Sequence, residues 1–66
     1  MIKCHLSTIL GRRKEKVSEC SESTGINKNT LYALYHERTQ RIELDVLDKL
    51  CEHLECSVGE LFEHVQ

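Results

Sequence analysis

A single glycine, Gly25, separates two short apolar patterns in the stretch SECSESTGINKNTLYALYHE. Before the glycine, Val17 and Cys20 recur at helical spacing, and after it Leu31 and Leu34 do the same. Glycine adopts the left-handed backbone conformation that ends a helix without a steric cost. The stretch therefore predicts two short helices joined by a tight turn. Any fold of the chain must include this sharp change of direction between the two helices.

Three positions around this turn carry the residue types that a helix-turn-helix needs. Ser21 is small, which lets two helices approach each other at a steep angle. Gly25 suits the tight turn, and Leu31 is an apolar side chain that anchors the helix after it. This combination indicates a helix-turn-helix unit over about residues 17–36.

Helical spacing of apolar residues continues on both sides of this unit, and proline is absent. The spacing predicts a first helix that begins near Leu6 and a fourth over Leu44–Leu54. A fifth is predicted over Val58–Val65, where Ser57 and Glu60 form a capping box. Only MIKCHL alternates apolar and polar residues, and it is either a short edge strand or a frayed start of the first helix.

The sequence thus predicts an all-α, five-helix domain, with at most a short extended segment at its N-terminus. Residues 1–66 are too few for more than one domain and lie near the lower size limit for independent folding. A core of this size supplies little stability, so a partner subunit would help. The predicted core consists of Leu10, Leu31, Leu34, Leu47, Leu50, Leu54 and Leu61.

The composition excludes several classes of protein. A hydrophobic fraction of 39% and a charged fraction of 30% are too balanced for a disordered chain. No apolar run reaches membrane-spanning length, and no signal-peptide pattern opens the chain. We therefore expect a cytoplasmic protein with no membrane partner.

The four cysteines form no Cys-x-x-Cys pair, the spacing that many zinc sites use. The segment CEHLEC, which contains Cys51, His53 and Cys56, imitates a ligand cluster. Helical spacing, however, places Cys51 on the apolar face of the fourth helix and points His53 away from that face. We expect reduced cysteines that behave as small apolar residues, with no structural metal or cofactor; a metal site is the less favoured alternative.

Charge is divided unevenly along the chain, although the whole chain has a net charge of -2. Residues 1–42 contain eight basic and four acidic side chains, a net charge of +4. Residues 43–66 contain one basic and seven acidic side chains, a net charge of -6. Because salt screens charges beyond about 8–10 Å, a polyanion responds to the local basic half rather than to the average.

On these residues the chain resembles the Cro/CI-type, lambda-repressor-like helix-turn-helix family, also called XRE-like. VSECSESTGINKNTLYALYHE is similar to its second and third helices, and LDVLDKLCEHLECSVGELFEHV to its last two. Three positions depart from the family pattern: Ser21 replaces the usual alanine, Val17 stands where many members have glutamine, and Glu37 replaces the glycine that often ends the third helix. The resemblance implies a DNA-binding domain like the short, stand-alone bacterial members.

In such a domain, the helix after the turn enters the major groove of DNA with its N-terminus first. The resemblance makes Lys28, Asn29 and Tyr32 the expected base contacts. Lysine donates to guanine, asparagine pairs with adenine, and tyrosine contacts a thymine methyl group or a phosphate. Ala33 is small enough for a close approach. Asn27 is a candidate contact too, although its first role is that of an N-cap.

Phosphate contacts are expected around the same helix, because cationic, imidazole and hydroxyl groups suit phosphate oxygens. The candidates are Lys16, Thr30, His36 and Arg38. Structural roles compete with some of these assignments. His36 also suits the end of a helix, Tyr35 suits the core, and Tyr32 is nearly as well explained as an ordinary surface residue.

Patterns of catalysis are absent from the sequence. No glycine-rich phosphate loop occurs, and no cysteine has a histidine partner at a recognised spacing. A chain this short also leaves little room for a substrate pocket. The sequence predicts a sequence-specific binder of double-stranded DNA that acts as a transcriptional regulator, more specifically a repressor, and not an enzyme. The alternative is a protein-interaction module such as an antitoxin or antirepressor partner.

A homodimer is expected for two reasons. The chain is short enough to profit from a second subunit, and DNA sites for such modules are commonly two-fold. The candidate apolar surface consists of Ile2, Val58, Phe62 and Val65.

Overall fold

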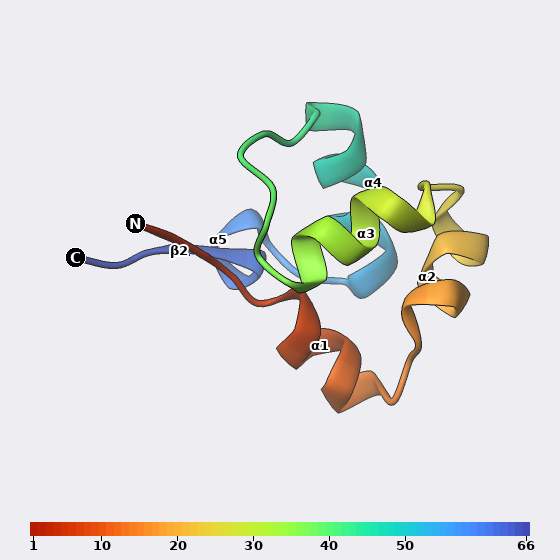
Figure 1. Ribbon diagram of the computed structural model, residues 1–66. Coiled ribbons are helices and arrows are strands. Elements are labelled where there is room, and N and C mark those ends of the chain that lie inside the picture. The colour runs from red at the N-terminus through yellow and green to blue at the C-terminus, as the bar shows by residue number, and fades with distance from the viewer.

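The computed structural model describes residues 1–66 as five helices and a two-stranded antiparallel sheet (Figure 1). In chain order the elements are β1 (Ile2–Cys4), α1 (Leu6–Arg13), α2 (Val17–Thr24), α3 (Lys28–Tyr35), α4 (Leu44–Leu54), α5 (Val58–Leu61) and β2 (Phe62–His64). The prediction of five helices is confirmed, but the fold is not purely all-α because its two ends pair as strands. None of the helices combines the length and the apolar character needed to cross a membrane.

α2 and α3 meet at the corner that Gly25 predicts. Gly25 ends α2 with a φ of 77°, in the left-handed region where glycine has no steric penalty. The Ser21 hydroxyl donates a 2.6 Å hydrogen bond to the carbonyl of Ile26, on the other side of the turn. The serine that replaces the usual alanine therefore fastens the turn to α2.

Ten buried apolar residues form the core between the helices. They are Leu6, Leu10, Val17, Cys20, Ile26, Leu31, Leu34, Leu50, Leu54 and Leu61. Cys20 of α2 and Leu31 of α3 have no exposed surface. Ile26 lies outside any helical pattern, in the turn itself, which is why its burial is not apparent from spacing.

Six of the seven predicted core leucines are buried, but Leu47 is only partly buried. Leu44, on the same predicted apolar stripe, is 79% exposed. Figure 1 shows the first turn of α4 projecting beyond the other helices, so this end of the apolar stripe is less covered. Leu50 and Leu54, further along α4, are buried as predicted.

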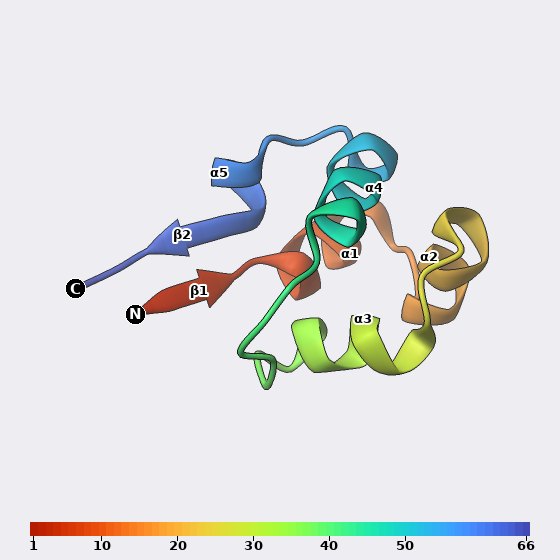
Figure 2. The same ribbon diagram turned by 90° about the horizontal axis from the view of Figure 1, so that it is seen from above.

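β1 and β2 lie side by side at the two ends of the chain, with Ile2 opposite His64 and Cys4 opposite Phe62 (Figure 2). Of the two alternatives for the N-terminal segment, the strand is confirmed. The predicted fifth helix to Val65 is wrong, because α5 stops after four residues and the chain becomes extended at Phe62. A longer helix would leave the backbone groups of β1 without these partners, and pairing with β2 satisfies them.

Glu37 follows α3 with a φ of 56°, in the left-handed region that glycine usually fills. Its carboxylate accepts a 3.0 Å hydrogen bond from the backbone N–H of Cys4. A glycine would avoid the strained backbone but has no side chain for this bond. The departure from the family pattern at Glu37 thus links the end of α3 to β1.

Leu31→Ala should lower the free energy of unfolding by about 2–5 kcal/mol, because the truncated side chain is fully buried. Leu44→Ala is the matched control: Leu44 is also helical but 79% exposed, so the change should be within about 0.5 kcal/mol. Urea unfolding followed by circular dichroism measures both values. Equal losses in the two variants would contradict this packing.

Candidate nucleic-acid interface

The two faces of α3 differ in chemistry. Leu31 and Leu34 are buried in the core, and the remaining positions of the helix turn toward solvent, since residues three or four apart share a face. Lys28, Asn29, Thr30 and Tyr32 are exposed, and Ala33 is half-buried beside them. All the predicted base contacts therefore lie at the surface of one helix.

A side-chain cap fixes the start of α3. The Asn27 Oδ1 accepts a 2.7 Å hydrogen bond from the backbone N–H of Asn29, as an N-cap residue does. Asn27 is thus a structural residue of the site, as the sequence suggested. The Asn29 side chain takes no part in this bond and is exposed, so its amide is available to a ligand.

Tyr32 and His36 extend the polar face by one helical turn. Their rings are stacked, with centroids 6.3 Å apart and planes inclined by 12°. The backbone N–H of His36 also donates a 3.0 Å hydrogen bond to the Tyr32 carbonyl at the end of the helix. His36 therefore combines the helix-ending role with an exposed ring. Tyr35 is partly buried and packs against the core, in line with its core interpretation.

Two cationic side chains flank the helix-turn-helix. Lys16 precedes α2, and Arg38 follows α3; both are exposed and neither forms an ion pair. The backbone N–H of Lys16 donates a 2.8 Å hydrogen bond to the Glu19 carboxylate, which leaves the lysine ammonium free. Both charges are available to an anionic partner.

The acidic part of the chain lies away from α3. Figure 2 shows α3 along one side of the molecule, with α4 and α5 on the opposite side. Residues 43–66, which carry the net charge of -6, include both of these helices. The polar face of α3 therefore faces solvent without an acidic helix in front of it.

A surface cavity of about 510 Å³ lies between the sheet and the segment from α3 to α4. This volume is ordinary for a small-molecule site, so the expectation that the chain has little room for a pocket is wrong. The cavity contains one thiol, that of Cys4, whose pKa is raised by burial and which is therefore a poor nucleophile at neutral pH.

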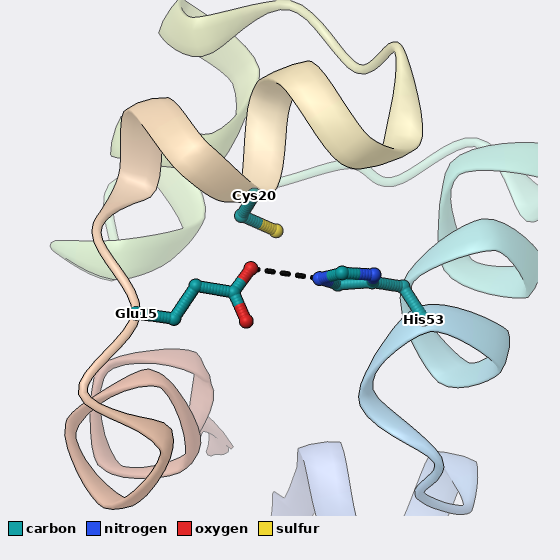
Figure 3. A group of neighbouring side chains, drawn as sticks. All are labelled: Glu15, Cys20 and His53. Atoms are coloured by element: carbon teal, nitrogen blue, oxygen red, sulfur yellow. Dashed lines mark hydrogen bonds and ion pairs between the residues drawn. The ribbon is translucent and has the colours of Figure 1, made fainter.

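His53 is the second feature that sequence spacing does not reveal. Its Nε2 lies 2.7 Å from Oε2 of Glu15, which precedes α2. Cys20 lies beside both groups (Figure 3). No spacing in the sequence pairs a cysteine with a histidine, and the structure brings His53 close to Cys20 by packing separate elements together. The signal is invisible in the sequence because the partners come from different elements, and Glu15 and His53 are 38 positions apart.

Comparison with known proteins agrees with this geometry. The family described as the Cro/C1-type HTH DNA-binding domain matches residues 5–66. An uncharacterized HTH-type transcriptional regulator of Bacillus subtilis (strain 168), YozG, is 33% identical over 60 residues, which cover 91% of this chain and 71% of the relative. No solved structure matches the chain. With a family match over nearly its whole length and the helix-turn-helix in place, the chain belongs to the Cro/C1-type HTH DNA-binding domain family.

Proposed function

We propose that this protein binds a specific double-stranded DNA sequence through α3 and represses transcription from the site that it covers. The observation that carries the proposal is the exposed polar face of α3, on the side of the molecule away from the acidic helices. Family membership and the relative's description as a transcriptional regulator support the same function. Repression is the simplest consequence, because a bound protein blocks access to the DNA under it.

Base contacts are assigned to the first turns of α3. Lys28 donates to guanine acceptors, and Asn29 pairs with an adenine in the major groove. Tyr32 lies one turn further along, with its exposed ring stacked beside that of His36, and contacts a thymine methyl group or a phosphate. Ala33 is half-buried and small, so it allows the helix to approach the bases.

Phosphate contacts are assigned to the two ends of the helix-turn-helix and to the polar groups of α3. Lys16 and Arg38 lie before α2 and after α3, so they can reach the DNA backbone on both sides of the groove. Thr30 and His36 supply further donors on the exposed face. The cap residue Asn27 acts indirectly, because it fixes the helix start from which the base contacts project.

We further propose a homodimer that forms at the sheet. A two-stranded sheet leaves the outer backbone edges of both strands unpaired, and such edges pair readily with another chain. Ile2 on β1 and Val58 on α5 are 61% and 52% exposed, and Phe62 and Val65 are half-buried nearby in the chain. Two such subunits would read a two-fold site with two copies of α3.

Selection of binding sites from random duplexes with the purified protein should enrich one motif. Asn29→Ala should then relax the preference at one base pair and cost about 1–3 kcal/mol there, because one bidentate contact is lost. The cap is unaffected by this change, since it uses the backbone N–H of Asn29.

Asn27→Ala is the matched control for Asn29→Ala. Loss of the cap should lower stability by about 1 kcal/mol and leave the preferred sequence unchanged. If no motif is enriched and low-salt affinity is undetectable, the DNA-binding proposal fails, and a protein-interaction role takes its place.

Arg38→Ala should weaken binding to all duplexes alike and flatten the dependence of log affinity on log salt by about one unit, because one phosphate contact is lost. Lys49→Ala is the control, since Lys49 is also an exposed cation but belongs to α4, outside the proposed DNA contacts. Fluorescence anisotropy across a salt series measures both slopes. A larger change of the salt slope in Lys49→Ala than in Arg38→Ala would indicate that DNA binds near α4 and would contradict the proposed interface.

Sedimentation equilibrium of the free protein should show a dimer. Ile2→Lys and Val58→Lys should each shift it to a monomer, because a charge would be buried in an apolar contact. Leu44→Lys changes a still more exposed apolar residue outside the sheet and should leave the dimer intact. A monomer both free and on DNA, or dissociation by Leu44→Lys alone, would rule out the sheet interface.

A further inference from the structure

Three side chains that can bind metal ions lie close together where α2, the segment before it and the end of α4 meet (Figure 3). Glu15 comes from the segment between α1 and α2, Cys20 from α2, and His53 from the last turn of α4. A carboxylate oxygen, the thiol sulfur and an imidazole nitrogen all lie within 4.8 Å of one another. In Figure 3 the Cys20 sulfur points toward the gap between the carboxylate and the imidazole.

The spacing of these atoms is close to that of a tetrahedral metal site. Bonds of about 2.0–2.3 Å from zinc to oxygen, nitrogen and sulfur place neighbouring ligand atoms about 3.3–3.6 Å apart. The Glu15–His53 pair, at 2.7 Å, would have to open slightly, and the widest separation in the cluster would have to close by about 1 Å. Side-chain rotations of this size need no change in the helices.

We propose that Glu15, Cys20 and His53 form a binding site for one divalent transition-metal ion with the preferences of zinc. Carboxylate, thiolate and imidazole are the three ligand types that zinc takes from proteins. Three protein ligands leave a fourth position for water. This proposal does not depend on the DNA-binding function, because none of the three residues belongs to the proposed DNA contacts.

The charges of the cluster suit a divalent cation. The Glu15 carboxylate and a Cys20 thiolate supply two negative charges, and His53 binds as a neutral imidazole. The Arg13 guanidinium, whose Nε lies 3.0 Å from Oε1 of Glu15, pairs with the other carboxylate oxygen and leaves Oε2 for the ion. Burial by itself raises the pKa of Glu15, but hydrogen bonds from His53 and Arg13 outweigh it and leave the pKa below its ordinary value. Glu15 is therefore ionised at neutral pH and ready to act as a ligand.

Cys20 has to lose a proton when the ion binds. Burial, followed by the nearby charge of Glu15, raises the pKa of its thiol to about 11, so the thiol is protonated in the free protein at neutral pH. A bound divalent ion stabilises the thiolate and releases that proton to solvent. The side chains of His53 and Glu15 keep 22% and 13% of their surface exposed, which gives the ion an entrance to the buried sulfur.

Cobalt(II) titration of the reduced, metal-free protein tests the site, because Co²⁺ occupies zinc sites and is coloured. We expect absorption bands of tetrahedral Co²⁺ and a thiolate-to-cobalt charge-transfer band, both saturating at one ion per chain. Zinc should then displace the cobalt and raise the melting temperature as its concentration increases, since the ion binds only the folded chain. Absence of the charge-transfer band would overturn the proposal.

Two ligand variants and two matched controls locate the ion. His53→Gln keeps a donor for Glu15 and should weaken binding by more than the roughly 10–100-fold typical of an outer-shell loss. Cys20→Ala should abolish the charge-transfer band. The controls Cys56→Ala and His64→Gln remove a cysteine and a histidine outside the cluster and should bind as the parent does.

Circular dichroism of each metal-free variant establishes whether it is folded. If Cys20→Ala is unfolded, the cobalt affinity of His53→Gln alone tests whether the ion binds at this site. Binding that is unchanged in His53→Gln, or lost in Cys56→Ala or His64→Gln, would place the ion elsewhere and refute the site.

Discussion

Burial of Leu31 and Leu34 against the rest of the core fixes the direction in which α3 faces. With these two side chains turned inward, the geometry of a helix leaves Lys28, Asn29 and Tyr32 on the outside. The turn before α3 has no freedom to change this, because Gly25 takes a left-handed conformation and Ser21 is bonded to Ile26 across it. The polar face of α3 is thus a consequence of core packing.

Ten buried residues form only a small core. The arrangement of the helices therefore also depends on individual hydrogen bonds between segments that lie far apart in the sequence. The β1–β2 pairing holds the two ends of the chain together. Glu37 bonds the end of α3 to β1, and His53 bonds the end of α4 to Glu15. These links keep α4 and α5, with their acidic side chains, on the side away from α3 (Figure 2).

The sequence predicted those parts of the fold that local spacing determines. Apolar periodicity and the Gly25 turn were sufficient for the helix-turn-helix, because both depend on residues only a few positions apart. The end of α5 was not predictable in this way. Phe62 and Val65 continue a helical pattern with Val58, but pairing with β1 gives their segment a better set of backbone partners.

The same distinction separates what was and was not predictable in the functional residues. The exposed side chains of α3 follow from the helical repeat once Leu31 and Leu34 are inside. The group of Glu15, Cys20 and His53 assembles only when three elements pack, and no short-range spacing encodes it. Exposure of Leu44 is another tertiary effect, since the apolar stripe of α4 extends beyond the elements that cover it.

In the proposed complex, α3 meets DNA while the acidic helices face away from it. Amide chemical-shift mapping of the isotope-labelled protein, titrated with its selected duplex, tests this most directly. We expect the largest shifts on residues 27–38 and on Lys16, with little change along α4 and α5. Shifts concentrated on α4 and α5, or none at a saturating concentration of the duplex, would contradict it.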